Sequence, residues 1–174
     1  MNAPAPSLIE VEVSDTQAHL SISPDWIANL VRRTLIHEGI ERADISVALV
    51  DDASIRVINA RYLLHDWATD VISFRFSEED SAELTGELVV SAEMAASTAV
   101  EANCEPAQEL ALYLVHGLLH LCGYNDQAAD DVAVIRGREG EVLGLLGIEN
   151  LFHRVDPLPV MSDDSGRESV RWPR

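Results

Sequence analysis

Two histidines four residues apart lie in the segment HGLLHLCGYND, which covers residues 116–126. On a helix, His116 and His120 share one face and can present their imidazoles to the same metal ion. Gly123 follows at a position where helix C-caps often take a left-handed conformation, so the chain can turn back. Asp126 can then approach the same point with a carboxylate, an acceptable zinc ligand. Two histidines and one aspartate leave a fourth tetrahedral position open, which is typical of catalytic zinc.

The same residues allow plainer interpretations. The spacing H-x3-H-x2-G-x2-D has the geometry of the metzincin zinc motif, but a histidine pair alone is a weak signal for a metal. Asp126 is also a suitable N-cap for a helix that begins in DQAADD, which would leave only two ligands. A peptidase is disfavoured, because Gly117 stands where zinc peptidases carry a glutamate base and glycine cannot accept a proton. Glycine there instead permits close approach of a packed neighbour or a substrate.

The elements that must position these residues follow from apolar periodicity and caps. Period-two alternation and short apolar runs predict strands at residues 8–14, 45–52, 69–76 and 86–94. Helical spacing predicts helices at residues 24–38, 52–64, 92–103, 106–122 and 126–147. The polar connection 77–85 has the size of a hairpin loop, so the last two strands should be antiparallel neighbours. We predict an α+β fold, with a small mixed sheet of about four strands, packed helices and a metal site at a helix end.

Length and composition narrow the class of protein. The chain of 174 residues fits one domain that can bury a core without disulfides, and we predict this domain over residues 1–152. Residues 153–174 have the polar, Pro- and Gly-containing composition of a disordered tail. No secretory signal and no apolar stretch of the roughly 20 residues that a membrane span needs are found, so we expect a cytoplasmic protein without membrane contact. Phosphate-loop, serine-hydrolase and Rossmann glycine patterns are also missing, which disfavours a dinucleotide cofactor.

The charge of the chain constrains its partners. The formal net charge is -18, and every basic residue is an arginine. Such a balance disfavours sequence-independent binding of nucleic acid, which depends on many Lys and Arg side chains that neutralise phosphates. If the substrate is nucleic acid, a few local arginines must provide the contacts.

Three motifs together resemble one known family. HGLLHLCGYND resembles H-G-x-L-H-L-x-G-Y-D-H, the signature of the YbeY family of bacterial endoribonucleases. Upstream, TDVISF and GELVVS resemble the family's T-D/N-V-L-S-F and G-D-I-x-I-S segments in the same order, and with the helix IRVINARYLLHDWA the match covers roughly residues 45–147. The resemblance implies a sheet-plus-helices fold and a zinc-dependent endoribonuclease with one ion that cleaves single-stranded RNA. It also implies action in ribosomal RNA maturation and ribosome quality control, with small ribosomal subunit components as partners.

Two positions depart from the family pattern. His116 and His120 correspond to the first two family ligands, whereas Asp126 takes the place of the third histidine. Leu63 takes the place of the arginine in N-x-x-Y-R that is thought to help RNA cleavage, and leucine gives no positive charge to transition-state oxygens. Arg75 stands where the family commonly has proline, and we consider it a candidate for a displaced phosphate contact. The alternative for Arg75 is a solvated arginine near the acidic segment SEED.

Further family-matching positions are Asn59, Asp70 and Ser73, for which structural roles are favoured, and Tyr124, which could equally pack or contact substrate. The leading function is a zinc endoribonuclease. A catalytically weakened ribosome-assembly factor is the alternative that Leu63 and Asp126 favour, and a metal hydrolase acting on a non-RNA substrate is the one that the negative charge favours.

Overall fold

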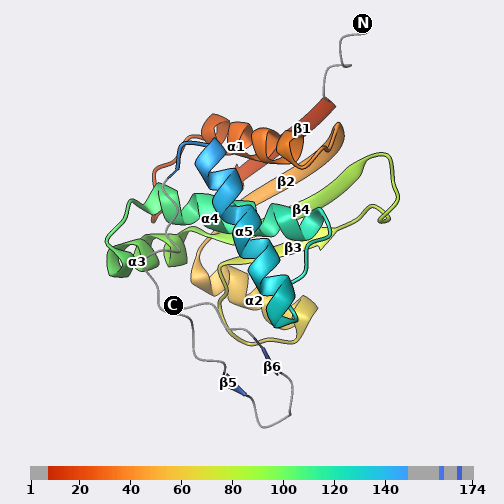
Figure 1. Ribbon diagram of the computed structural model, residues 1–174. Coiled ribbons are helices and arrows are strands. Elements are labelled where there is room, and N and C mark those ends of the chain that lie inside the picture. The colour runs from red at the N-terminus through yellow and green to blue at the C-terminus, as the bar shows by residue number, and fades with distance from the viewer. Residues whose placement is uncertain (1–7, 149–160, 163–167, 170–174) are drawn as a thin grey trace, which may run out of the picture.

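The computed structural model describes residues 8–148, 161–162 and 168–169. One mixed sheet and five helices make up the main body (Figure 1). In chain order the elements are β1 (Leu8–Asp15), α1 (Pro24–His37), β2 (Arg42–Val50), α2 (Asp52–Leu63), β3 (Val71–Arg75), β4 (Leu84–Ser91), α3 (Ala92–Ala102), α4 (Pro106–Leu121) and α5 (Ala129–Leu145). The predicted α+β class is confirmed.

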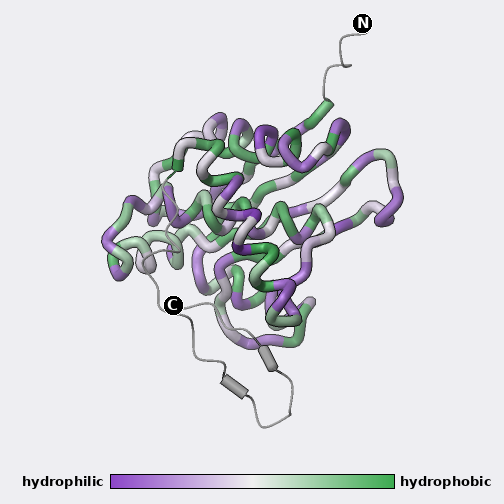
Figure 2. The backbone as a smooth tube through the Cα atoms, in the orientation of Figure 1, coloured by the Kyte–Doolittle hydropathy of each residue, from purple (hydrophilic) through white to green (hydrophobic). Residues whose placement is uncertain are grey.

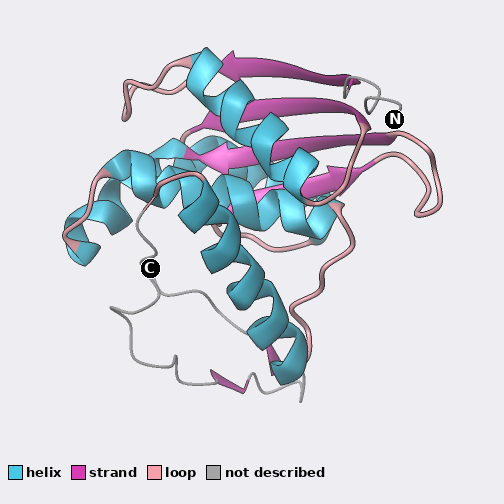
Figure 3. Cartoon of the chain, turned by 45° about the horizontal axis from the view of Figure 1, so that its top comes forward, coloured by secondary structure: helices cyan, strands magenta, loops and turns pink. Residues whose placement is uncertain are grey.

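The sheet has the strand order β1-β2-β4-β3. β1, β2 and β4 are parallel, whereas β3 pairs antiparallel with β4 at the edge, so the hairpin predicted from the polar connection is confirmed. Figure 3 shows these strands side by side with helices packed across the near face. A separate ribbon of two-residue strands joins β5 (Met161–Ser162) to β6 (Glu168–Ser169). The rest of the predicted disordered tail lies outside the described residues, and the boundary at residue 152 stays a prediction.

Two clusters of buried side chains divide the core between the faces of the sheet. The larger cluster joins α1, α4 and α5 to the residues of β2 and β4 that point to their side, whereas α2 covers a smaller cluster of four buried residues: Val50, Ile55, Ile72 and Val89. Helix α4 is buried along nearly its whole length, as its apolar composition requires. Hydrophobic colour follows α4 and the strands in Figure 2, and the connection between β3 and β4 is mostly hydrophilic. The helix that carries both histidines is therefore held rigidly in the centre of the molecule.

Element ends differ from the prediction where a cap decides them. The fourth strand was predicted to reach residue 94, but β4 ends at Ser91, whose side chain accepts a hydrogen bond from the backbone N–H of Met94 and so begins α3. Helix α1 ends before Gly39, which has a φ of 77° as a left-handed helix end requires. Ser23 is the N-cap residue of α1 but makes no side-chain capping bond.

Gly117 lies where α4 packs closely against the sheet. A Cβ atom at this position would come within 2.8 Å of Val71 Cγ2, 2.9 Å of Leu88 Cδ2 and 3.1 Å of Ser73 Oγ. These distances are shorter than van der Waals contact, so a larger residue would push α4 away from β3 and β4. The glycine that takes the place of a peptidase glutamate is therefore required for packing.

Replacing Gly117 with alanine is expected to lower the free energy of unfolding by about 1–3 kcal/mol, because the added methyl group overpacks the contact between α4 and the sheet. Urea denaturation of the metal-free protein measures the change. Gly137→Ala is the matched control: Gly137 is an exposed residue of α5, a Cβ atom added there would meet nothing within 4 Å, and alanine should be neutral or stabilising. Equal effects at both positions would contradict the packing role of Gly117.

Candidate metal centre

The end of α4 turns the chain back toward its own last turn. Pro106 is the first residue of the helix, and the helix ends at Leu121. Gly123 has a φ of 100°; its N–H donates to the carbonyl of His120, and the N–H of Tyr124 donates to the carbonyl of Leu119, each at 3.0 Å. The left-handed turn predicted at Gly123 is confirmed, and it directs the following residues toward the histidines.

His116, His120 and Asp126 meet at one point. The Nε2 atoms of the two histidines are 3.0 Å apart, and Asp126 Oδ2 lies 3.5 Å from Nε2 of His120 and 3.9 Å from Nε2 of His116. Zinc bonds of 2.0–2.2 Å in a tetrahedral arrangement would separate ligand atoms by roughly 3.3–3.6 Å. The three residues thus surround a space of the size of one ion and form a group that could bind a metal.

Helix α5 begins too late for the alternative role of Asp126. The N-cap of α5 is Ala128 and its first residue is Ala129, so Asp126 does not cap this helix. Its backbone N–H instead donates to the Oδ1 atom of Asn125 at 3.0 Å. The carboxylate of Asp126 remains directed at the two histidines.

Hydrogen bonds at the other ring nitrogens determine which tautomer each histidine adopts. His120 Nδ1 lies 3.0 Å from the carbonyl oxygen of Tyr124, which can only accept, so Nδ1 must carry the proton. His116 Nδ1 lies 2.6 Å from Oε1 of Glu139 and donates to this carboxylate. In the neutral rings both Nε2 atoms therefore present lone pairs to each other and to the Asp126 carboxylate. This arrangement is unfavourable without a positive charge between the atoms, and the donor set fits a divalent metal.

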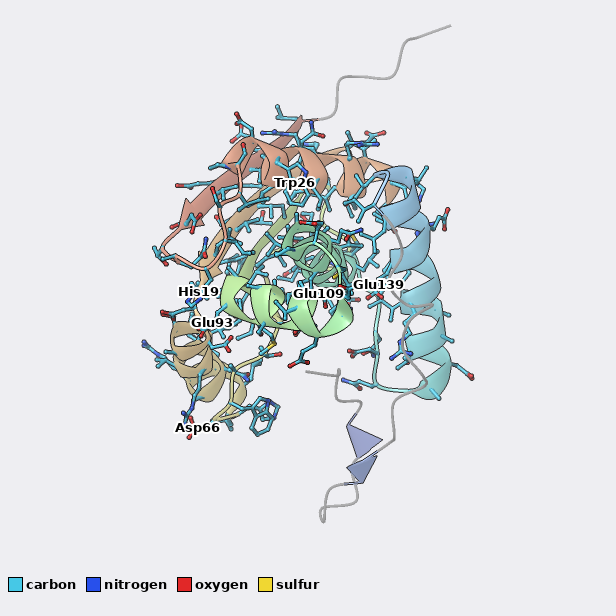
Figure 4. The ribbon with its side chains drawn as sticks, turned by 90° about the vertical axis from the view of Figure 1, so that its left-hand side faces the viewer. His19, Trp26, Asp66, Glu93, Glu109 and Glu139 are labelled. Carbon is cyan, nitrogen blue, oxygen red and sulfur yellow. The ribbon has the colours of Figure 1, made fainter. Side chains whose placement is uncertain are left out.

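Glu139 contacts His116 and was not named in the sequence prediction. Its side chain is fully buried and extends from α5 toward α4, as the labelled side chain in Figure 4 shows. Burial raises the pKa of Glu139, and the hydrogen bond from His116 opposes that shift. Carboxylates that hold the second nitrogen of a metal-ligating histidine fix its orientation and increase its basicity. A signal was available: Glu139 lies on the apolar face of α5 between the buried residues Ile135 and Val142.

The electrostatics of the metal-free cluster predict a pH-dependent stability. Burial would lower the pKa of His120, but its hydrogen bond and ion pair with Asp126 outweigh burial and raise it above 6.5. The hydrogen bond from His120 lowers the pKa of Asp126 below 3.8. The stability that His120 contributes is fully present below pH 6.5 and is lost as the pH rises through the raised pKa of His120. The stability that Asp126 contributes is present above pH 3.8 and is lost as the pH falls through the lowered pKa of Asp126.

The pair is therefore expected to stabilise the metal-free protein most between about pH 4 and pH 6.5. Urea unfolding of the EDTA-treated wild type and of Asp126→Asn, from pH 3 to pH 9, measures this contribution. The stability difference between the two proteins should be largest in that window and should shrink above it. A difference that keeps growing toward pH 9 would contradict the assignment.

The guanidinium of Arg75 donates hydrogen bonds to backbone carbonyl groups. Its Nη1 donates to the carbonyl of Leu121 at 3.0 Å, and Nη2 and Nε donate to the carbonyls of Glu78, Glu79 and Ser77. The side chain thus ties the connection after β3 to the last turn of α4. These bonds favour a structural role, and the phosphate contact proposed for Arg75 stays a prediction.

The other family-matching residues also bond to backbone. Ser73 Oγ donates to the carbonyl of Gly117, Asn59 Nδ2 donates to the carbonyl of Trp67, and Asp70 accepts from the N–H of Val71. These contacts agree with the structural roles that were favoured. Leu63 is the last residue of α2 and is 46% exposed.

A family model described as Endoribonuclease YbeY matches residues 9–147. The chain belongs to the YbeY family. Membership places it among nuclease hydrolases, and the match extends beyond the segment 45–147 that carried the resemblance. Within the described part of this YbeY-family chain, no helix combines the length and the apolar character needed to cross a membrane.

Several curated relatives are named Endoribonuclease YbeY. The protein of Rhodopirellula baltica is 40% identical over 129 residues, which cover 73% of this chain and 62% of that protein. The protein of Carboxydothermus hydrogenoformans is 34% identical over 140 residues, which cover 80% of this chain and 93% of that protein. A solution structure from Thermotoga maritima aligns with a TM-score of 0.53 and 24% identity, covering 80% of this chain and 92% of that one. This likeness supports the fold.

Proposed function

We propose that the protein is a zinc-dependent endoribonuclease that cleaves single-stranded RNA during ribosomal RNA maturation and ribosome quality control in the cytoplasm. The observation that carries the proposal is the convergence of His116, His120 and Asp126 on one point in a member of an endoribonuclease family. Ribosomal RNA is the proposed substrate, and components of the small ribosomal subunit are the proposed partners.

The burial of the three side chains is graded from the core to the surface. The side chain of His116 is 7% exposed, whereas those of His120 and Asp126 are 26% and 32% exposed. The cluster is therefore closed on the side of Glu139 and open to solvent on the side of His120 and Asp126. This is the arrangement expected of a site that admits a substrate.

The protein and the ion have separate tasks in the proposed reaction. A zinc ion in this site would polarise a phosphodiester oxygen and make a water molecule more acidic. Glu139 and the Tyr124 carbonyl hold the two imidazoles with their Nε2 lone pairs directed at the open point. The buried side of the cluster excludes solvent behind His116. No described residue is assigned as general base, and Gly117 cannot act as one.

Cleavage of a 5′-labelled unstructured RNA by the purified protein tests the function directly. The protein should cleave this RNA with zinc, lose activity after EDTA treatment, recover it when zinc returns, and leave a duplex of the same sequence intact. A His120→Ala preparation made in parallel detects contaminating ribonuclease. Zinc-independent cleavage, or equal cleavage by His120→Ala, would refute the proposal.

A second function is favoured by Leu63, which replaces the arginine of the family pattern. A protein without this charge can keep the fold and bind the ribosome while its cleavage is weak or absent. Co-sedimentation with small ribosomal subunits together with no cleavage of unstructured RNA by the zinc-loaded protein would support this assembly-factor function over the first.

A further inference from the structure

Glu38 lies at the C-terminal end of α1 and reaches the segment that carries Asp126. Its Oε2 atom accepts a hydrogen bond from the hydroxyl of Tyr124 at 3.0 Å, and its Oε1 atom accepts one from Nε of Arg138 at 2.7 Å. The Glu38 side chain is only 4% exposed. Both carboxylate oxygens of Glu38 thus accept hydrogen bonds from residues that lie far away in the sequence.

Each of the two residues that Glu38 holds is connected to a histidine of the metal centre. Tyr124 accepts the Nδ1 proton of His120 with its carbonyl oxygen and precedes Asp126 by two residues. Arg138 directly precedes Glu139, which accepts the Nδ1 proton of His116. One buried carboxylate therefore joins the loop after α4 to the helix α5, and the two groups that orient the imidazoles lie on these two segments.

We propose that Glu38 is a positioning residue for the metal centre, which holds Tyr124 and Arg138 together and thereby sets the relative orientation of His120 and His116. The inference rests on the proposed metal site but not on its RNA substrate. Charged hydrogen bonds in a buried position are short and directional, so they are suited to fix a loop. The rigidity matters because metal affinity depends on ligand atoms that are already in place before the ion arrives.

The network predicts a loss of zinc affinity without the loss of a ligand. Residues that orient metal-ligating histidines typically contribute about 10- to 100-fold to metal affinity, and Glu38 acts one contact further out. Tyr124→Phe removes one hydroxyl and keeps the ring that packs against the core, and Glu38→Gln keeps the shape of the side chain. We expect each to weaken zinc binding by about 10-fold, and the double variant to be little weaker than Glu38→Gln alone.

Zinc affinity is measured on the EDTA-treated full chain by competition with a chromogenic chelator, and the visible spectrum of bound cobalt reports the geometry of the site. Glu41→Gln is the matched control, because it removes the same charge from an exposed position three residues along the chain. Glu139→Gln is the positive control, since it weakens the direct hydrogen bond to His116. Thermal unfolding of the metal-free variants reports their stability separately.

Weaker zinc binding and an altered cobalt spectrum in Tyr124→Phe and Glu38→Gln, but not in Glu41→Gln, would support the positioning role. Zinc affinities within about two-fold of wild type, with a lower melting temperature alone, would overturn it. If Glu38→Gln does not fold, Tyr124→Phe decides the question. A wild type that binds no zinc would refute the metal-dependent function as well, whereas a zinc-binding wild type with unaffected variants would refute only this inference.

Discussion

The His120→Ala protein is expected to purify without bound zinc and to cleave single-stranded RNA more than about 100-fold more slowly than the wild type. His120 contributes Nε2 to the shared point, and its Nδ1 is held by the Tyr124 carbonyl, so no neighbouring nitrogen can replace it. Residues that only orient ligands contribute up to about 100-fold to metal affinity, so the loss of a ligand should cost more. Elemental analysis and the labelled-RNA assay measure the two effects on one preparation.

His19→Ala is the control for this experiment. His19 is an exposed histidine whose partner, Glu93 at 3.6 Å, lies on α3, and its replacement should change neither zinc content nor cleavage. Asp126→Ala separates a three-ligand site from a two-histidine site, and it should also lose zinc. Zinc content equal to wild type in Asp126→Ala would show that the third-ligand assignment is wrong. Asp126→His, which restores the residue of the family pattern, should keep the ion.

The parts of the site that the sequence predicted are those with local causes. The spacing of His116 and His120 follows from the pitch of one helix, and the turn that returns Asp126 follows from the left-handed conformation of Gly123. The four strands could also be predicted from the sequence, because alternation and apolar runs are properties of short segments. The end of β4 was predicted too late, because the cap at Ser91 ends the strand and begins α3, and apolar periodicity does not detect this cap.

The residues that support the histidines were not predictable in this way. Glu139 lies 23 residues from His116, and Glu38 lies 86 residues from Tyr124, so their contacts depend on how α5 and α1 pack against α4. Local periodicity can place Glu139 on the buried face of α5, but it does not indicate which residue on another helix it contacts. Arg75 shows the same limit: it lies in the predicted strand 69–76, but its bond to the carbonyl of Leu121 depends on how closely α4 packs on the sheet.

Replacing Leu63 with arginine is expected to raise the rate of RNA cleavage by zinc-loaded protein about 10-fold or more, because an arginine that reaches the transition-state phosphate can contribute far more than this in phosphoryl transfer. Leu63 ends α2 and is 46% exposed, so a guanidinium there can stay in contact with water and displaces no buried side chain. The neighbouring Arg61 does not take the place of this arginine, because its guanidinium stacks on Tyr62, 5.3 Å from the ring centre. Single-turnover kinetics should show the gain in the rate of the chemical step.

Leu64→Arg is the matched control, because it adds the same charge at the next residue. Leu64 is 88% exposed and has a φ of 60°, so its side chain projects from the left-handed end of α2 in a different direction from that of Leu63. General attraction of RNA by one added charge would accelerate both variants equally and would fade as salt increases. A gain confined to Leu63→Arg that persists at high salt would show that the leucine limits catalysis. No gain at unchanged zinc content would contradict this role of Leu63.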